Sequence, residues 1–228
     1  MTLQTMQFEA LISELTQPLA GQYPRPWMTD MRLPQSAKVF IVGANQAKHF
    51  PITAFDHRRH LDALFNRNGQ SCRRLYDELY PRPSKTRPNL DDFENRLSAA
   101  GVTEVLQTNV VCYSTHMSAD LRKKEHRSGA KAGGRIFGEL LKAIRPKVVV
   151  LHGVGTCEAF EAQFDVLVPR PPANEAEGIR GARLTVKDIE TEIIVIPSLA
   201  PPGFHLWSKW AKRHLDAVSA HIAASLRN

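Results

Sequence analysis

The sequence predicts an α/β fold, a three-layer sandwich in which a central, mainly parallel four-stranded sheet lies between helices. Three observations predict it: apolar runs of strand length, helical patterns between these runs, and glycine or proline where the runs stop. Strands that alternate with helices pair in parallel and are covered on both faces, which explains why these runs are apolar at nearly every position.

The predicted strands and helices alternate along the chain. The strands are KVFIVG at 38–43, EVLQTNVV at 104–111, KVVVLHG at 147–153 and EIIVIPS at 192–198. Helices are predicted at 71–80, 91–101, 133–144 and 155–164. Irregular segments at 23–36, 80–90 and 168–182 contain several prolines and are predicted to be surface loops.

Both ends of the chain are predicted to be helical as well. With 228 residues, the chain is long enough for one domain with a sizeable core and too short to favour two. We therefore expect a single domain over 1–228, with an N-terminal helical extension at about 1–20.

The composition narrows the class of protein. Lys and Arg number 30 against 23 Asp and Glu, a net charge of +7, which favours an anionic partner such as nucleic acid. The three cysteines lack a paired spacing, so we expect no disulfide framework, no metal and no cofactor. From the unpaired cysteines and the lack of a signal-peptide pattern and of a membrane-spanning apolar run, we expect a cytoplasmic protein that binds no membrane. We also expect a monomer.

Ligands of open α/β sheets bind where loops leave the carboxyl ends of the strands. The first such loop begins at Gly43 and lacks the patterns of dinucleotide-binding and P-loop sites. Asn45 in this loop either holds a water or a substrate edge, or shapes the turn through its own backbone. Asn109 interrupts an apolar strand, and because an unpaired buried amide costs about 1–3 kcal/mol, it should have a structural or ligand partner.

Positive charge gathers after the second predicted strand. The cations there are Arg122, Lys123, Lys124, Arg127, Lys131 and Arg135, interrupted by Gly129, Gly133 and Gly134. Side chains and backbone amides of such a segment can wrap phosphates, which we expect here in preference to a solvated loop.

Apolar side chains follow the last predicted strand. The loop IPSLAPPGFHLW, at 196–207, contains Leu199, Phe204, His205 and Leu206. Either these side chains enter a base stack as a wedge, or the loop lies on the core.

Together these segments resemble the motifs of the uracil-DNA glycosylase superfamily. GANQ at 43–46 stands in the place of that superfamily's first motif, of the type G-x-N-P or G-E-x-P, and TNVVCY at 108–113 matches its strand with a base-reading Asn. IPSLAPP at 196–202 corresponds to its final H-P-S-P motif and the wedge loop. The resemblance spans Lys38 to Trp210, with the motifs in the same order.

The resemblance implies a monofunctional DNA glycosylase, which flips a base out of DNA, hydrolyses its N-glycosidic bond and leaves an abasic site. It implies that Asn109 reads the base and that Asn45 positions the attacking water. The implied base contacts are Gly43, Ala44, Gln46 and a stacking ring, either Phe50 or Phe55. The implied DNA contacts are Lys123, Lys124, Arg127, Ser198 and a wedge, either Leu199 or Phe204.

Two departures from the superfamily pattern predict a rebuilt pocket. Ile196 stands where the superfamily has a His that aids the leaving base, so His205 or His116 would have to replace it, and we take His205 as the catalytic candidate. Gln46 replaces a Pro, and the first motif contains no acid to act as a general base. Asp56 is instead predicted to cap a helix that begins at His57.

These departures favour a modified or bulky base as substrate, such as the modified cytosines that phages install, with uracil as the alternative. Two other functions fit the same residues: a catalytically silent reader of modified DNA, and a nucleoside or nucleotide hydrolase. The sequence leaves open single-stranded or double-stranded DNA, and repair or defence against phage.

Overall fold

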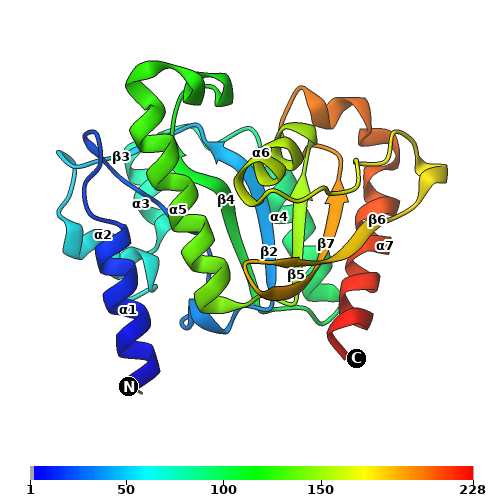
Figure 1. Cartoon of the computed structure of the whole chain (residues 1–228), viewed down its shortest axis with the longest axis horizontal. Helices are drawn as coiled ribbons and strands as arrows, with labels where there is room; N and C mark the ends of the chain where they lie inside the picture. Colours follow the sequence, from blue (N-terminus) through cyan, green and yellow to red (C-terminus); the bar gives the residue numbers. More distant parts are fainter. Residues whose placement is uncertain (1–2, 228) are drawn as a thin grey trace.

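The central sheet has five strands, in the order β4-β2-β5-β7-β6 (Figure 1). The computed structural model describes residues 3–227. β4, β2, β5 and β7 are parallel, and β6 is antiparallel at the edge. The strands are β2 (Val39–Gln46), β4 (Val105–Ser114), β5 (Val148–His152), β6 (Arg180–Val186) and β7 (Ile189–Ile196), and a separate two-stranded sheet is formed by β1 (Gln22–Tyr23) and β3 (Phe50–Pro51).

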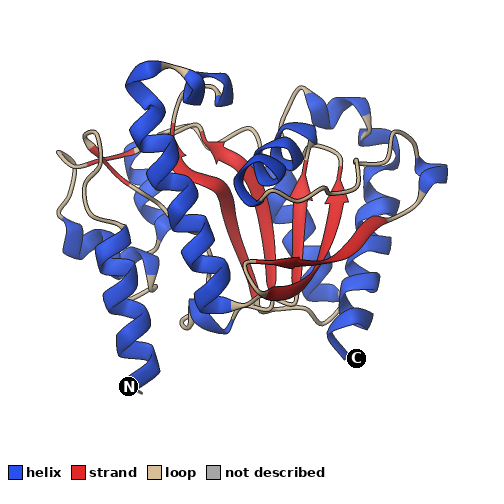
Figure 2. Cartoon of the chain, viewed as in Figure 1, coloured by secondary structure: helices blue, strands red, loops and turns tan. Residues whose placement is uncertain are grey.

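Helices cover both faces of the sheet (Figure 2). One core contains side chains of α1 (Leu3–Leu15), α2 (His57–Leu64), α3 (Cys72–Leu79), α5 (Arg127–Ile144) and α6 (Val154–Phe164). The other contains side chains of α4 (Arg87–Ala99) and α7 (Ser208–Arg227). Phe40 and Val42 of β2 belong to the first core, and Val39 and Ile41 to the second. This burial on both faces explains the continuous apolar runs, and the predicted α/β class is confirmed.

The edge strand β6 corrects the predicted count of four strands and the predicted loop at 168–182. Its side chains alternate between exposed and partly buried, so no continuous apolar run marks it. Lys187 and Asp188 both have positive φ and form a two-residue turn, across which Val186 pairs with Ile189. Turns of this kind suit the twist of a β-hairpin. A polar edge strand also discourages pairing with another sheet.

The glycines predicted to belong to a phosphate-binding loop lie in the helix α5 instead. This helix begins well before the expected start at 133, and it contains Gly129, Gly133 and Gly134. A Cβ on Gly129 would lie 2.4 Å from the Tyr113 ring, and one on Gly133 would lie 2.9 Å from Val111. The glycines therefore let α5 approach β4 closely. Gly133 and Gly134 lie inside the helix, where backbone amides are used within the helix itself.

The start of α2 is as predicted. The Asp56 side chain accepts a hydrogen bond of 2.8 Å from the backbone N–H of Arg59, and the helix begins at His57. This contact satisfies one of the amides that a helix N-terminus leaves free. Asp56 is therefore a capping residue.

Within residues 3–227, no helix is long and apolar enough to cross a membrane. The same residues contain no group of three or more His, Cys, Asp or Glu arranged to hold a metal ion. The three cysteines are buried, and burial raises the pKa of Cys72 and Cys112 to about 12. These two thiols therefore stay protonated and act as apolar packing groups.

Candidate functional site

A cavity of about 760 Å³ opens at the carboxyl ends of the parallel strands. Its lining comes from the ends of β2, β4 and β5, the loop after β7, and the segments 25–28 and 84–90. The predicted residues that line it are Gly43, Ala44, Asn45, Gln46, Asn109 and Ser198. The cavity lies where an open α/β sheet places its ligands, so the strand ends brought these residues together.

Gly43, Asn109 and His152 meet in the wall of this cavity, each from a different strand. Gly43 of β2 is paired with Asn109 of β4. A Cβ on Gly43 would lie 2.8 Å from Asn109 Oδ1 and 3.1 Å from His152 Nε2, so only glycine leaves room for the amide and the imidazole here. The Asn109 carboxamide forms no hydrogen bond with residues 3–227 and is available to a ligand.

His152 is the candidate that the sequence patterns did not single out. Burial lowers the pKa of this imidazole to about 4, so it is neutral near pH 7. Its Nδ1 is buried and has no partner among the described residues, while Nε2 lies toward Gly43 and Asn109. A neutral imidazole offers one N–H donor and one acceptor. The available signal was a histidine at the carboxyl end of the predicted strand KVVVLHG.

The buried imidazole of His152 predicts a pH dependence of stability. Its native pKa of about 4 lies below the ordinary value of 6.5, so between these pH values the unfolded chain binds a proton that the native chain does not. The free energy of unfolding should therefore fall as the pH drops from 6.5 to 4, by about 3 kcal/mol from this group. Urea titrations should show a flatter pH dependence for His152→Ala; an unchanged slope would contradict the assignment.

Hydrogen bonds fix the side chains of Asn45 and Gln46. Asn45 Nδ2 donates to Thr115 Oγ1 at 2.7 Å and to the Gln46 carbonyl at 3.3 Å, and its Oδ1 accepts from Ser118 at 2.6 Å. Gln46 Nε2 donates to the carbonyl of Arg25. Asn45 thus ties the end of β2 to the segment after β4 and keeps one Oδ1 lone pair for a water. Gln46 holds the Arg25 backbone in place.

Neither phenylalanine expected to stack on a base lines the cavity. Phe50 is 1% exposed and packs edge-on against Phe55, with ring centroids 5.7 Å apart. The segment that carries them pairs with β1 and turns into the core. Trp27 and Tyr76 line the cavity instead. Both are core rings, 1% and 4% exposed: Trp27 stacks on Phe8, and the guanidiniums of Arg25 and Arg87 lie over the Tyr76 ring, so neither presents an open face to a base.

Cationic side chains line the cavity. Those among its described lining residues are Arg25, Lys48, Arg73, Lys85 and Arg87, and the described lining contains no Asp or Glu. Arg73 is paired with Asp91, and Arg87 with Asp77, outside the lining. The cavity therefore favours an anionic ligand, and no carboxylate in its described lining can serve as a general base.

The loop after β7 presents a different leucine from the one predicted. Leu199 is 0% exposed in the core, and Phe204 packs against Trp207 with ring centroids 5.5 Å apart. Leu206 is 89% exposed. Leu199 is therefore not available as a wedge, and Leu206 is the apolar side chain that this loop presents to a partner.

Ile196 stands where the superfamily has a histidine. The two candidates for that histidine's role, His205 and His116, lie in different places. His205 belongs to the short helix η5 (Gly203–Leu206), is exposed and does not line the cavity. His116 is exposed and lines the cavity. His152 is more enclosed than either and lies beside Asn109, so it is the better replacement.

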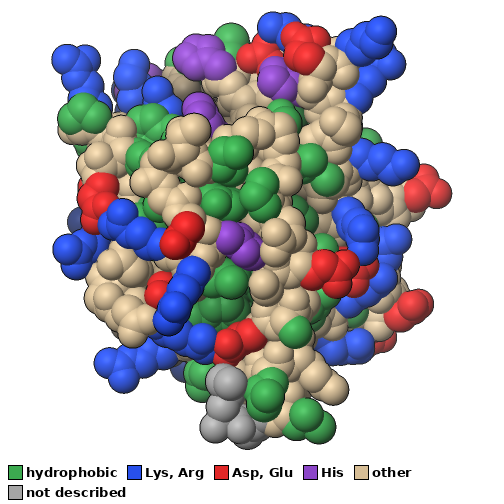
Figure 3. Space-filling model, turned by 90° about the vertical axis from the view of Figure 1, so that its left-hand side faces the viewer, with side chains coloured by type: hydrophobic (Ala, Val, Ile, Leu, Met, Phe, Trp, Pro, Cys, Tyr) green, Lys and Arg blue, Asp and Glu red, His purple; other side chains and the backbone are tan. Residues whose placement is uncertain are grey.

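Lys123, Lys124 and Arg127 lie on the surface, not in the cavity. All three are exposed, in or next to η3 (Lys124–His126), and Lys123 is paired with Asp120 at 2.8 Å. Lys, Arg and His side chains lie along the upper edge in Figure 3, with a few Asp and Glu side chains among them, on the side toward which the parallel strands point in Figure 1. These cations are placed to contact phosphates around the cavity rather than inside it.

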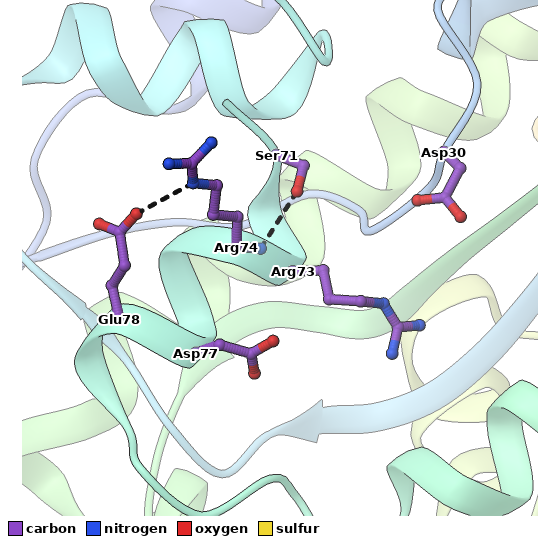
Figure 4. A pocket seen from close by; sticks show the side chains of 6 residues that line it. All are labelled: Asp30, Ser71, Arg73, Arg74, Asp77 and Glu78. Carbon is purple, nitrogen blue, oxygen red and sulfur yellow. Dashed lines mark hydrogen bonds and ion pairs between the residues drawn. The ribbon is translucent and has the colours of Figure 1, made fainter. Parts of the chain in front are cut away.

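A second depression on the surface has most of its charges already paired. It is lined by Asp30, Ser71, Arg73, Arg74, Asp77 and Glu78 (Figure 4). Arg74 lies between Ser71, which accepts from its backbone N–H, and Glu78, with which it forms an ion pair of 3.4 Å. Acids and bases that neutralise one another leave little attraction for a charged ligand.

Comparison with protein-family models gives no match for this chain, and comparison with curated proteins gives none either. The function is therefore inferred from the geometry and chemistry of the cavity.

Proposed function

We propose that the protein is a monofunctional DNA glycosylase that flips a modified base, such as a modified cytosine, into the cavity and hydrolyses its N-glycosidic bond. The observation that carries this proposal is the free Asn109 carboxamide beside the neutral imidazole of His152, across Gly43. The motif segments that resemble the uracil-DNA glycosylase superfamily, at 43–46, 108–109 and 198–201, all contribute to the same cavity, which supports the proposal.

The charges of the cavity favour catalysis at the leaving base. When the C1′–N bond breaks, its electron pair stays on the base, and the sugar becomes oxocarbenium-like. A water then adds to C1′ and releases a proton, and the base takes up a proton. The N–H groups of His152 and Asn109, with the surrounding cations, stabilise the negative charge that develops on the base. This route needs no carboxylate to activate the water.

The size of the cavity supports a substituted base over an unmodified pyrimidine. Its volume of about 760 Å³ lies in the upper part of the range of small-molecule sites, roughly 300–1,000 Å³.

The surface around the cavity fits DNA better than a free nucleoside. Met117 and Val154 line the cavity and are 61% and 51% exposed, and Leu206 in the loop after β7 is 89% exposed. With the exposed cations of η3, these side chains provide an apolar contact for unstacked bases and a charged contact for phosphates. A hydrolase of free nucleosides has no need of either.

The proposal is tested with oligonucleotides that carry uracil, hydroxymethylcytosine or glucosylated hydroxymethylcytosine at one position, in single and double strands. Alkali after incubation cuts the strand at any abasic site. We expect cleavage confined to one base. Tight binding with intact strands would instead indicate a silent reader, and release of base from free nucleosides without DNA affinity would indicate a nucleoside hydrolase.

Leu206→Ala tests the wedge. Because unstacking a base in a duplex costs a few kcal/mol, a side chain that fills the gap should matter most in duplex DNA. We expect the ratio of single-strand to double-strand cleavage rates to rise about tenfold. Leu167→Ala, which removes a leucine that is 83% exposed and does not line the cavity, should keep the wild-type ratio. The same ratio in both variants would exclude Leu206 as the wedge.

A further inference from the structure

Arg25 lies against two aromatic rings in the lining of the cavity. Its guanidinium carbon is 4.8 Å from the centroid of the Phe50 ring and 5.8 Å from that of Tyr76. Both rings belong to the core, with 1% and 4% of their surface exposed. Contacts of a guanidinium with ring faces offset part of the free energy lost when the cation leaves water.

The segment that carries Arg25 is fixed to the sheet and to α2. Thr108 Oγ1 donates to the carbonyl of Pro26 at 2.6 Å, and His60 Nε2 contacts the carbonyl of Pro24 at 2.9 Å. Met28 and Gln107 exchange two backbone hydrogen bonds of 2.8 and 3.0 Å. The backbone on both sides of Arg25 is thus held in place.

The Arg25 guanidinium has no acidic partner. Its Nη1 is buried without a hydrogen-bond partner among residues 3–227, and no carboxylate there forms an ion pair with it. Burial lowers its pKa below the ordinary value. The neighbouring Arg73 and Arg87 each have an aspartate partner, so among the arginines of the described lining only Arg25 lacks a counter-charge. A guanidinium whose Nη1 is buried without a partner is unfavourable unless a ligand supplies the negative charge.

We infer that the flipped base carries an anionic substituent, a carboxylate or a phosphate, which Arg25 receives. This inference rests on the proposed glycosylase function, because it describes the base that the same cavity accepts. A guanidinium presents paired N–H donors whose spacing matches the two oxygens of such a group.

The position of Arg25 favours the base over the DNA backbone as the source of the charge. Lys48 and Lys85 are exposed, whereas Arg25 is partly buried behind core rings. When a nucleotide flips, its base enters the pocket and its phosphates stay on the strand outside. The exposed lysines are therefore the partners for backbone phosphates, and Arg25 meets the inner edge of the base.

The test uses duplexes that carry 5-carboxylcytosine or 5-hydroxymethylcytosine at one position and measures binding by fluorescence anisotropy, independently of base release. We expect the wild-type protein to bind the carboxylated duplex roughly 10- to 100-fold more tightly. Arg25→Met should bring this ratio to about one, and Arg25→Lys, which keeps the charge but loses the paired donors, should retain part of it. Lys85→Met is the matched control and should weaken binding to both duplexes equally. Thermal melts establish that each variant is folded.

A third duplex, with neutral methylphosphonates flanking the 5-carboxylcytosine, separates the two sources of charge. If the inference is right, Arg25→Met still binds this duplex more weakly than the wild-type protein does. If the effect of Arg25→Met disappears when the phosphates are neutral, or if the wild-type protein shows no preference for the carboxylate, the inference is overturned. Preferential binding through Arg25 without base release would leave the inference standing and refute the glycosylase. Release of a neutral base, with no preference for the carboxylated duplex in binding, would support the glycosylase and overturn the inference.

Discussion

Replacing His152 with alanine is expected to slow base release by about 100- to 1,000-fold, the loss typical of removing one preorganised donor to a developing negative charge. The imidazole is neutral because burial lowers its pKa to about 4, and its Nε2 lies toward Asn109 in the cavity wall. It can therefore donate to the leaving base at pH 7. Single-turnover kinetics would measure the rate, and anisotropy the DNA affinity, which should stay within about twofold because the interaction strengthens in the transition state.

His205→Ala is the control for this prediction. His205 is exposed and does not line the cavity, so its loss should change the rate by less than about threefold, as for most surface substitutions. A large effect of His205→Ala with a small effect of His152→Ala would return the catalytic role to the loop after β7. Equal loss of DNA affinity and rate in His152→Ala would indicate a collapsed pocket instead of a lost donor.

Gly129→Ala is expected to destabilise the protein by about 1–3 kcal/mol or more, although alanine normally favours a helix over glycine by about 1 kcal/mol. The new Cβ would lie 2.4 to 2.6 Å from three atoms of the Tyr113 ring. That ring cannot move freely, because Tyr113 is 2% exposed and its hydroxyl is hydrogen-bonded to His126 at 3.1 Å. Urea unfolding would measure the difference.

Gly138 in the same helix provides the comparison. A Cβ there meets only a Phe164 ring carbon at 3.9 Å, an ordinary contact, so Gly138→Ala should be neutral or stabilising by up to about 1 kcal/mol. Similar loss of stability in both variants would mean that helix packing on β4 does not depend on Gly129. In that case the glycines of α5 would require another explanation.

The fold was predictable wherever burial on both faces of the sheet left a continuous apolar run, as in β2 and β5. β6 was not, because an edge strand is apolar only at alternate positions, and its signal was the turn at Lys187 and Asp188. The glycines of α5 were misinterpreted for a related reason. Glycine suits both a phosphate loop and a close helix-strand contact, and only the position of Tyr113 distinguishes the two.

The sequence predicted those residues of the candidate site that lie at the carboxyl ends of the parallel strands. Gly43 and Asn109 follow from the rule that ligands lie at the carboxyl ends of parallel strands. Phe50 was expected to stack on the base and Leu199 to act as the wedge. Both roles require an exposed side chain, and both side chains are buried in the core. Arg25 enters the site from a proline-rich loop far from any motif, and its contact with Phe50 and Tyr76 is a property of the tertiary structure alone.

The backbone contacts that fix the 24–28 segment bear on the kinetics of ligand entry. Met28 is bridged to Gln107, and the carbonyls of Pro24 and Pro26 are held by His60 and Thr108. Because this wall of the cavity is ordered before any ligand arrives, little conformational entropy remains to be lost there on binding. Once a base is unstacked, its capture should be a single step, with an observed association rate that rises linearly with concentration and shows no plateau from a slow closing motion.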